Sequence, residues 1–97
     1  MLPTFNIVAE IIAQTCDVPR ERITPASNLL NDLGIDSLDL LDVAFAIDDA
    51  FGIAMPIDQW LQGVHVGRIS TDHYFVMKEF CSNIDALIDA AAAQRNS

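Results

Sequence analysis

Apolar residues recur at steps of three and four positions along almost the whole chain, as they do on one face of an α-helix. The pattern predicts an all-α fold without strands. We expect helices over residues 4–17, 37–51 and 57–64, followed by a last helical region over residues 71–93. The loop over residues 18–36 is long for a helical domain, which indicates that it has a function.

Residues at the helix ends support these boundaries. The expected caps are Thr4 and either Ser70 or Thr71 at the N-terminal ends, and the expected terminators are Gly52, Gly63 and Gly67. Pro56 prevents the second helix from continuing. The pair at positions 82–83 can divide the last helical region in two.

The composition is that of one small globular domain spanning residues 1–97. Of the 97 residues, 52% are hydrophobic and 20% charged, which is enough for a modest core. Cys16 and Cys81 have no second cysteine or histidine at metal-ligand spacing, so we interpret both as small buried side chains. No apolar run approaches the roughly 18 residues that span a bilayer, and MLPTFN lacks the basic start of a signal peptide.

The net charge of −9 is concentrated in one stretch. Residues 31–58 hold seven aspartates and no lysine or arginine. The negative electrostatic potential of these aspartates repels nucleic acid and anionic lipid and favours basic partner proteins, although the charge can also serve solubility alone. We therefore expect that the protein neither binds nucleic acid nor inserts into membranes. The isolated cysteines and the lack of a basic signal start favour a reducing cytoplasm, and we expect a monomer.

A helical wheel of residues 37–51 has three sectors. The core face holds Leu40, Val43, Ala44, Ile47 and Phe51, and the opposite face holds Asp39, Asp42 and Asp49. Between them lie Leu38, Leu41 and Phe45, with Asp48 at the edge. Either another segment covers these apolar residues, or they form an exposed strip edged by carboxylates that docks partner proteins.

Ser37, in the stretch LGIDSLDLL, could be a helix cap, a nucleophile or an attachment point. The sequence has no G-x-S-x-G motif, and its two histidines, His65 and His73, lie in other segments as expected surface residues, which argues against a hydrolase. Asp36 can cap the helix by accepting the N–H of residue 38 or 39, which leaves the Ser37 hydroxyl pointing outward. A helix N-terminus also favours a phosphate. The nearby aspartates lack the spacing of a calcium loop, so we expect no metal site.

The segment GIDSLDLLDVAFAIDDAFGIAMP resembles the acyl carrier proteins, and the similarity spans nearly the whole chain. The resemblance implies a bundle of four to five helices with an extended region after the second long helix. It also implies that Ser37 carries 4′-phosphopantetheine, which a phosphopantetheinyl transferase attaches from coenzyme A. Asp36 matches the residue that helps to hold magnesium in the complex between the carrier protein and the transferase. Such a protein holds acyl groups as thioesters and catalyses no reaction itself.

The resemblance also implies a set of partner enzymes. These are the transferase, ketoacyl synthases and other fatty-acid enzymes, and an acyltransferase. By position, the residues that such partners contact are Leu38, Asp39, Leu41, Asp42, Phe45, Asp48 and Asp49. An unmodified acidic interaction module, in which Ser37 is only a cap, is the alternative of another class.

The segment IDQWLQGVHVGRISTDHYFVMKEFCSNID is longer than its counterpart in a typical carrier. It resembles the specialised carriers that deliver very-long-chain fatty acids to lipid A, whereas the alternative is a housekeeping fatty-acid or polyketide carrier. Candidates for an acyl pocket are Leu40, Ala44, Ile47, Trp60, Tyr74 and Met77. The aromatic residues of the segment, Phe80 among them, can equally complete the core.

Overall fold

The computed structural model describes residues 3–68 and 70–95, which form five α-helices and one 3₁₀ turn. The elements are α1 (Pro3–Cys16), the 3₁₀ turn η1 (Arg20–Arg22), α2 (Ser37–Phe51), α3 (Ile57–His65), α4 (Thr71–Phe75) and α5 (Met77–Arg95). Across these two ranges, one isolated β-bridge between Asn28 and Val76 is the only strand-like pairing. The predicted all-α fold is therefore confirmed.

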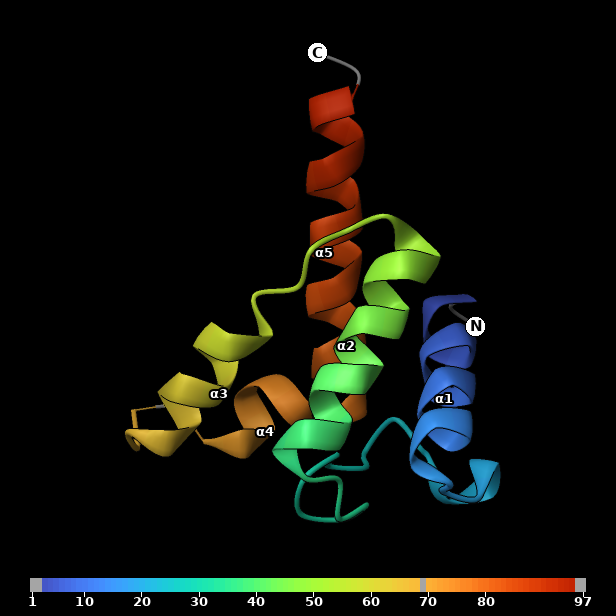
Figure 1. Ribbon diagram of the computed structural model, residues 1–97, viewed down its shortest axis with the longest axis vertical. Helices are drawn as coiled ribbons and strands as arrows, with labels where there is room; N and C mark the ends of the chain where they lie inside the picture. The colour runs from blue at the N-terminus through green and yellow to red at the C-terminus, as the bar shows by residue number, and fades with distance from the viewer. Residues whose placement is uncertain (1–2, 69, 96–97) are drawn as a thin grey trace.

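Three long helices pack together, and two short ones lie to one side (Figure 1). Helix α1 contacts both α2 and α5, α2 contacts α3, and α4 contacts α5. The last turns of α5 extend beyond the rest of the bundle. The N-terminal end of α2 and the C-terminal end of α3 both lie in the lower half of this view, far from the C-terminal end of α5.

One apolar core joins all of these helices. Its fully buried members include Val8, Ile12, Leu29, Leu40, Val43, Ile47, Phe75, Phe80 and Ile84. Each buried side chain of this size stabilises the fold by roughly 1.5–3 kcal/mol relative to an exposed one. The core face predicted for α2 is confirmed for four residues, whereas Phe51 is only partly buried.

The long connection between α1 and α2 is folded into the core. It contributes five buried apolar side chains: Val18, Ile23, Leu29, Leu33 and Ile35. Asp17 ends α1 in the left-handed region, with φ of 56°, and Gly34 turns the chain toward α2 with φ of 69°. The length of this connection therefore serves packing, because it closes one end of the bundle.

The prediction that Thr4 caps the first helix is wrong. Thr4 lies within the first turn of α1, which begins at Pro3. Its hydroxyl instead donates a hydrogen bond of 2.6 Å to Asp85 Oδ1. The residue therefore ties α1 to α5, a contact between distant parts of the chain that local spacing cannot reveal.

The glycines behave differently at the ends of α2 and α3. Gly52 closes α2 in the left-handed conformation, as predicted, with φ of 67°. Gly63 was expected to help end α3 but lies inside that helix. The helix ends at His65, and Gly67 closes it two residues later in the left-handed region, where the N–H of Arg68 donates to the Gly63 carbonyl and that of Gly67 donates to the Val64 carbonyl. This pair of bonds is a Schellman motif.

The last helical region divides at Val76, and not at positions 82–83, which lie inside α5. Val76 is extended, with φ of −73° and ψ of 133°. Ser70 occupies the predicted cap position of α4, although its side chain makes no capping bond.

Contacts with the α1–α2 connection explain the position of this division. Val76 forms the β-bridge with Asn28. On either side of it, the Leu29 N–H donates to the Phe75 carbonyl and the Met77 N–H donates to the Ser27 carbonyl, both at 2.8 Å. The distant loop thus holds this part of the chain extended.

Candidate functional site

Asp36 and Ser37 begin α2 as the sequence predicts. Asp36 is the N-cap, and its Oδ1 accepts a hydrogen bond of 2.8 Å from the Asp39 N–H. The predicted cap is therefore confirmed. Ser37 is the first residue of the helix and is exposed, and its hydroxyl makes no hydrogen bond to any residue within 3–68 or 70–95. The hydroxyl is thus accessible, and it makes no hydrogen bond that stabilises the described structure.

This division of roles leads to a stability prediction. We expect Asp36→Ala to lower the free energy of unfolding by about 1 kcal/mol, because α2 loses its cap. Ser37→Ala should leave it nearly unchanged, and Asp36→Asn, which can still cap, is the matched control. Urea unfolding followed by far-UV circular dichroism measures all three. Equal losses in Asp36→Ala and Ser37→Ala would contradict the assignment of the cap.

The start of α2 fits a phosphodiester-linked group. The first N–H groups of a helix have no partner within the helix, and its N-terminus carries a partial positive charge. Asp36 accepts from the Asp39 N–H, and the N–H groups of Ser37 and Leu38 have no hydrogen-bond partner among the described residues. A phosphate on the Ser37 oxygen would meet this positive end, which offsets the repulsion of the neighbouring carboxylates.

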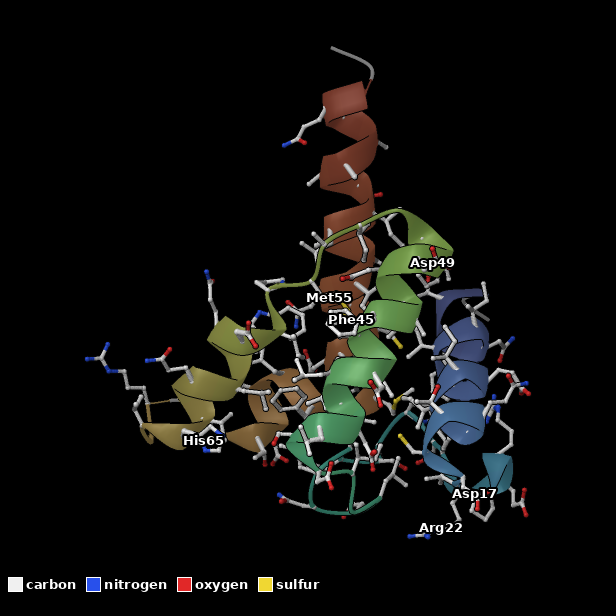
Figure 2. The ribbon with its side chains drawn as sticks, in the orientation of Figure 1. Asp17, Arg22, Phe45, Asp49, Met55 and His65 are labelled. Atoms are coloured by element: carbon white, nitrogen blue, oxygen red, sulfur yellow. The ribbon has the colours of Figure 1, made fainter. Side chains whose placement is uncertain are left out.

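The apolar sector of α2 is largely exposed. Leu38 is 72% exposed and Phe45 is 66% exposed, whereas Leu41 is partly buried against the core. Asp42 and Asp49 are exposed on the same helix. Figure 2 shows the Phe45 and Asp49 side chains on α2. Another segment therefore does not cover Leu38 or Phe45.

Asp48 has a local partner that the sequence did not reveal. Its Oδ1 accepts a hydrogen bond of 2.9 Å from the Met55 N–H. Asp48 is partly buried, as is Asp39. The Asp48 carboxylate therefore stabilises the turn that follows α2, a role separate from partner contact.

The six candidates for an acyl pocket lie in or against the core. Tyr74 is partly buried, and the other five are buried. The Trp60 and Tyr74 rings stack with centroids 4.9 Å apart, and Phe80 meets Trp60 edge-on at 6.2 Å. In the structure, these aromatic residues therefore fill core space.

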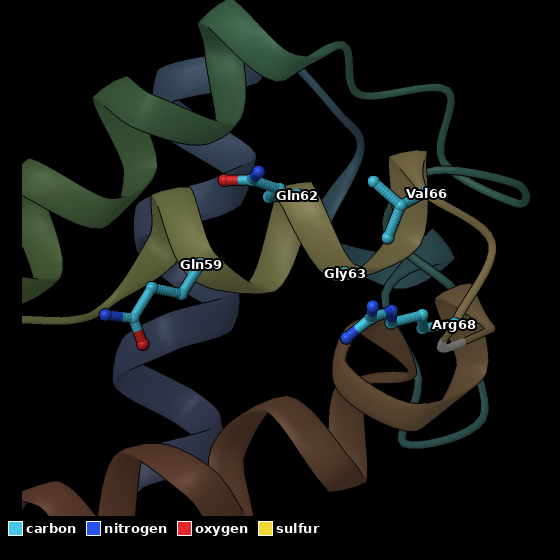
Figure 3. Close-up of a pocket in the computed structure, with 5 residues that line it drawn as sticks. All are labelled: Gln59, Gln62, Gly63, Val66 and Arg68. Atoms are coloured by element: carbon cyan, nitrogen blue, oxygen red, sulfur yellow. The ribbon is translucent and has the colours of Figure 1, made fainter.

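A cavity of about 370 Å³ lies elsewhere, on α3. It is lined by Gln59, Gln62, Gly63, Val66 and Arg68, and by none of the six candidates (Figure 3). The sequence did not predict this cavity because its lining residues follow no motif. The polar side chains of Gln59, Gln62 and Arg68 were the available signal.

The two cysteines are poor nucleophiles. Burial, helped by the charge of Asp85, raises the pKa of Cys81 to about 12. Cys16 is only partly buried, contrary to expectation, but burial and the carboxylates of Asp39, Asp36 and Asp42 raise its pKa as well. Both thiols therefore stay protonated at neutral pH.

Other chemistry finds little support within the described ranges. His65 and His73 are exposed, as predicted, and the described residues include no cluster of three or more His, Cys, Asp or Glu suited to a metal ion. None of the helices described here is both long and apolar enough to cross a bilayer.

An exposed serine at the head of an acidic helix, with a hydroxyl that bonds to no other described residue, is the arrangement of a covalent attachment point. Residues 6–71 match the family model described as "Phosphopantetheine attachment site". The chain belongs to the acyl carrier proteins, which are non-catalytic and carry covalent 4′-phosphopantetheine. The family match favours this role over the unmodified interaction module.

Individual relatives resemble the chain to different extents. It is 53% identical over 90 residues to "Acyl carrier protein AcpXL" of Brucella melitensis, covering 93% of this chain and 97% of that protein. The protein of the same name from Mesorhizobium japonicum is 54% identical over 93 residues, which cover 96% of this chain and 100% of that protein. An acyl carrier protein of Helicobacter pylori is 32% identical over 65 residues, which cover 67% of this chain and 83% of that protein.

Proposed function

We propose that this protein carries very-long-chain acyl groups for lipid A synthesis, as thioesters on 4′-phosphopantetheine attached to Ser37. The observation that carries the attachment site is the exposed Ser37 hydroxyl, which has no partner among the residues described because Asp36 caps α2. The chain-length proposal rests on the extended segment after α2. Its support is the high similarity to the two proteins named AcpXL, which extends along nearly all of this chain.

The attachment uses the accessible Ser37 oxygen as the nucleophile and needs no catalytic base on this protein. The Ser37 oxygen forms a bond to the phosphorus of the pantetheine phosphate, and the adenosine bisphosphate portion of coenzyme A leaves with the bonding electrons. The transferase takes the hydroxyl proton, and Asp36 helps to hold its magnesium ion. When bound, the group supplies the thiol that forms the thioester. This role explains why Ser37 has no base beside it.

The proposal also includes the oligomeric state, the location and the partners of the protein. A single carrier domain over residues 1–97 acts as a monomer in the cytoplasm, where coenzyme A and the fatty-acid enzymes are found. Its partners are the transferase, ketoacyl synthases and an acyltransferase. A housekeeping carrier is the second candidate, because the close stacking of Trp60 on Tyr74 suits a plain core as well as a long-chain shelter.

We further propose that partners dock on α2 by way of the predicted strip. Leu38 and Phe45 offer exposed apolar surface beside the exposed carboxylates of Asp42 and Asp49. The carboxylates steer a basic partner, and the apolar residues contribute contact area. The docking surface also includes the accessible atoms of three partly buried residues, Asp39, Leu41 and Asp48.

Charge reversal tests this docking surface. We expect Asp42→Lys with Asp49→Lys to weaken binding to the transferase, most strongly at low salt, because salt screens exposed charges. Asp89→Lys, which changes an exposed carboxylate of α5, is the control and should have less effect. Isothermal titration calorimetry at two salt concentrations gives the Kd values. Equal Kd values for the docking and control variants would contradict a role of Asp42 and Asp49 in binding and would indicate that they serve solubility only.

The role of Trp60 leads to a test of chain length. We expect Trp60→Ala to reduce loading of very long acyl chains more than that of medium chains, because it removes the ring that stacks on Tyr74. Trp60→Phe retains an aromatic ring and should preserve the preference. Mass spectrometry of the loaded carrier measures both. Equal reductions for the two chain lengths would leave Trp60 as a core residue only.

A further inference from the structure

The cavity on α3 is polar and belongs to none of the surfaces proposed so far. We call it the α3 hollow and define it by its lining residues, Gln59, Gln62, Gly63, Val66 and Arg68. Figure 3 shows the Arg68 side chain extending back beneath Gly63, whose lack of a side chain leaves room for it. Gln59 projects to the same side of α3 in this view, whereas Gln62 and Val66 project to the other. The hollow thus places a guanidinium and a primary amide on one side of the helix.

The charge of the α3 hollow is opposite in sign to that of α2. Residues 59–71 form the longest stretch of the sequence without aspartate or glutamate, although the chain holds 14 such residues. Arg68 is the only charged residue that lines the hollow. The hollow is therefore a positive point on a strongly acidic protein.

The Arg68 guanidinium is free to bind a ligand. The two other arginines with described side chains are engaged: Arg20 donates to the Ile23 carbonyl at 3.2 Å, and Arg22 donates to the Asp32 carbonyl at 3.1 Å. Arg68 is exposed, and its side chain makes no hydrogen bond or ion pair with any residue that the structure describes. The planar fork of an unpaired guanidinium matches the two oxygens of a carboxylate.

The other groups of the α3 hollow also favour a carboxylate ligand. The Gln59 NH₂ is a further donor on the side of Arg68, and it makes no hydrogen bond to a described residue. A basic ligand would be repelled by the guanidinium. A bare acyl chain would have to desolvate polar groups without pairing them. A carboxylate instead pairs with the donors of both side chains.

A carboxylate on a partner protein suits the α3 hollow better than a free anion does. The net charge of −9 repels a free anion, which would also lose its translational freedom for a single ion pair. An acidic side chain on a protein that is docked on α2 has neither cost, because the basic surface of that protein supplies the attraction. Helices α2 and α3 contact each other, so one protein can reach both (Figure 1).

We propose that the α3 hollow binds an aspartate or glutamate side chain of the acyltransferase while that enzyme docks on α2. The proposal rests on the proposed function, which names the acyltransferase as a partner. The carboxylates along α2 attract a basic surface but distinguish poorly between its orientations. An additional contact of opposite sign favours one orientation and disfavours its reverse. Arg68 is thus a positioning residue that sets how the acyltransferase sits relative to Ser37.

Binding of the full-length holo protein to the acyltransferase of the same cells tests this contact. We expect Arg68→Gln to raise the Kd roughly two- to fivefold, as for one exposed ion pair, and Arg68→Glu to raise it further. Arg68→Lys keeps the charge and should lose less. Arg22→Gln makes the same change of charge on η1 and should leave the Kd nearly unaltered. Isothermal titration calorimetry gives the Kd values, and circular dichroism confirms that each variant is folded.

Carbodiimide cross-linking identifies the group that faces position 68. The carbodiimide activates a carboxylate of the acyltransferase, and the amine introduced by Arg68→Lys displaces the urea to form an amide bond. Arginine does not react in this way, and Lys78 is the only lysine of the unaltered chain. We expect peptide mass spectrometry to find position 68 of this variant joined to one aspartate or glutamate of the enzyme. Arg22→Lys is the control and should give no such cross-link.

The possible outcomes separate this contact from the proposed function. Equal Kd values for Arg68→Glu and the unaltered protein, or no cross-link at position 68, would overturn the role of the α3 hollow and leave docking on α2 intact. Failure of the unaltered protein to bind the acyltransferase would contradict the proposed partner and the hollow together. Binding to phosphatidylglycerol vesicles that depends on Arg68, without an effect on the acyltransferase, would assign the guanidinium to a lipid surface and overturn the proposal.

Discussion

Ser37→Ala is expected to abolish phosphopantetheine transfer, whereas the unaltered protein gains one group. The expectation follows from the exposed Ser37 hydroxyl at the head of α2, the oxygen that becomes bonded to phosphorus. Intact mass after incubation with coenzyme A, magnesium and a broad-specificity transferase measures the result. Ser82→Ala changes an exposed serine of α5 and should still gain the group.

The loss in Ser37→Ala must not come from unfolding. Because Asp36 provides the cap, circular dichroism of Ser37→Ala should match that of the unaltered protein. A mass gain in this variant would place the attachment on another residue. A failure of the unaltered protein to gain mass would contradict the attachment proposal itself.

Asn28→Ala is expected to cause the largest loss of stability, about 3 kcal/mol or more. The Asn28 side chain is 3% exposed, and its Nδ2 donates to Thr71 Oγ1 at 3.1 Å and to Asp72 Oδ1 at 2.8 Å. Its Oδ1 accepts from the N–H groups of Leu30 and Asn31, each at 2.9 Å. Truncation therefore removes four hydrogen bonds, two of which join the α1–α2 connection to α4.

A neighbouring residue provides the control for Asn28. Asn31 also donates to Thr71 Oγ1, at 2.9 Å, but it is exposed and makes no other side-chain bond of this network. We expect Asn31→Ala to cost only about 0.5–1.5 kcal/mol. Urea unfolding gives both values. Similar losses for Asn28→Ala and Asn31→Ala would contradict the central role of Asn28.

The sequence predicts those features of the fold that depend on neighbours along the chain. The periodicity and the capping chemistry of α2 are local, so its boundaries, the Asp36 cap and the Gly52 terminator were all predictable. The division between α4 and α5 was not, because Val76 is extended through its bridge to Asn28, far away in the sequence. Thr4 was misassigned for the same reason, since its partner is Asp85 on α5.

The candidate site shows the same limit. A helical wheel sufficed to place Leu38 and Phe45 away from the core, because their directions follow from helix geometry. The bond between Asp48 and the Met55 N–H depends on how the chain turns after α2. The turn at Gly67 was predicted, but no motif marks the residues that line the cavity beside it.

The central proposal is that Ser37 bears a phosphopantetheine arm that carries very long acyl chains, and one measurement tests it directly. The protein is purified from the cells that make it, and its intact mass is recorded before and after hydroxylamine cleaves thioesters. The raised pKa values of Cys16 and Cys81 lower their thiolate fractions, so both thiols react slowly with acyl donors. We expect a population bearing phosphopantetheine and a very long acyl chain that hydroxylamine releases. Protein with no phosphopantetheine, or with medium chains alone, would contradict the proposal.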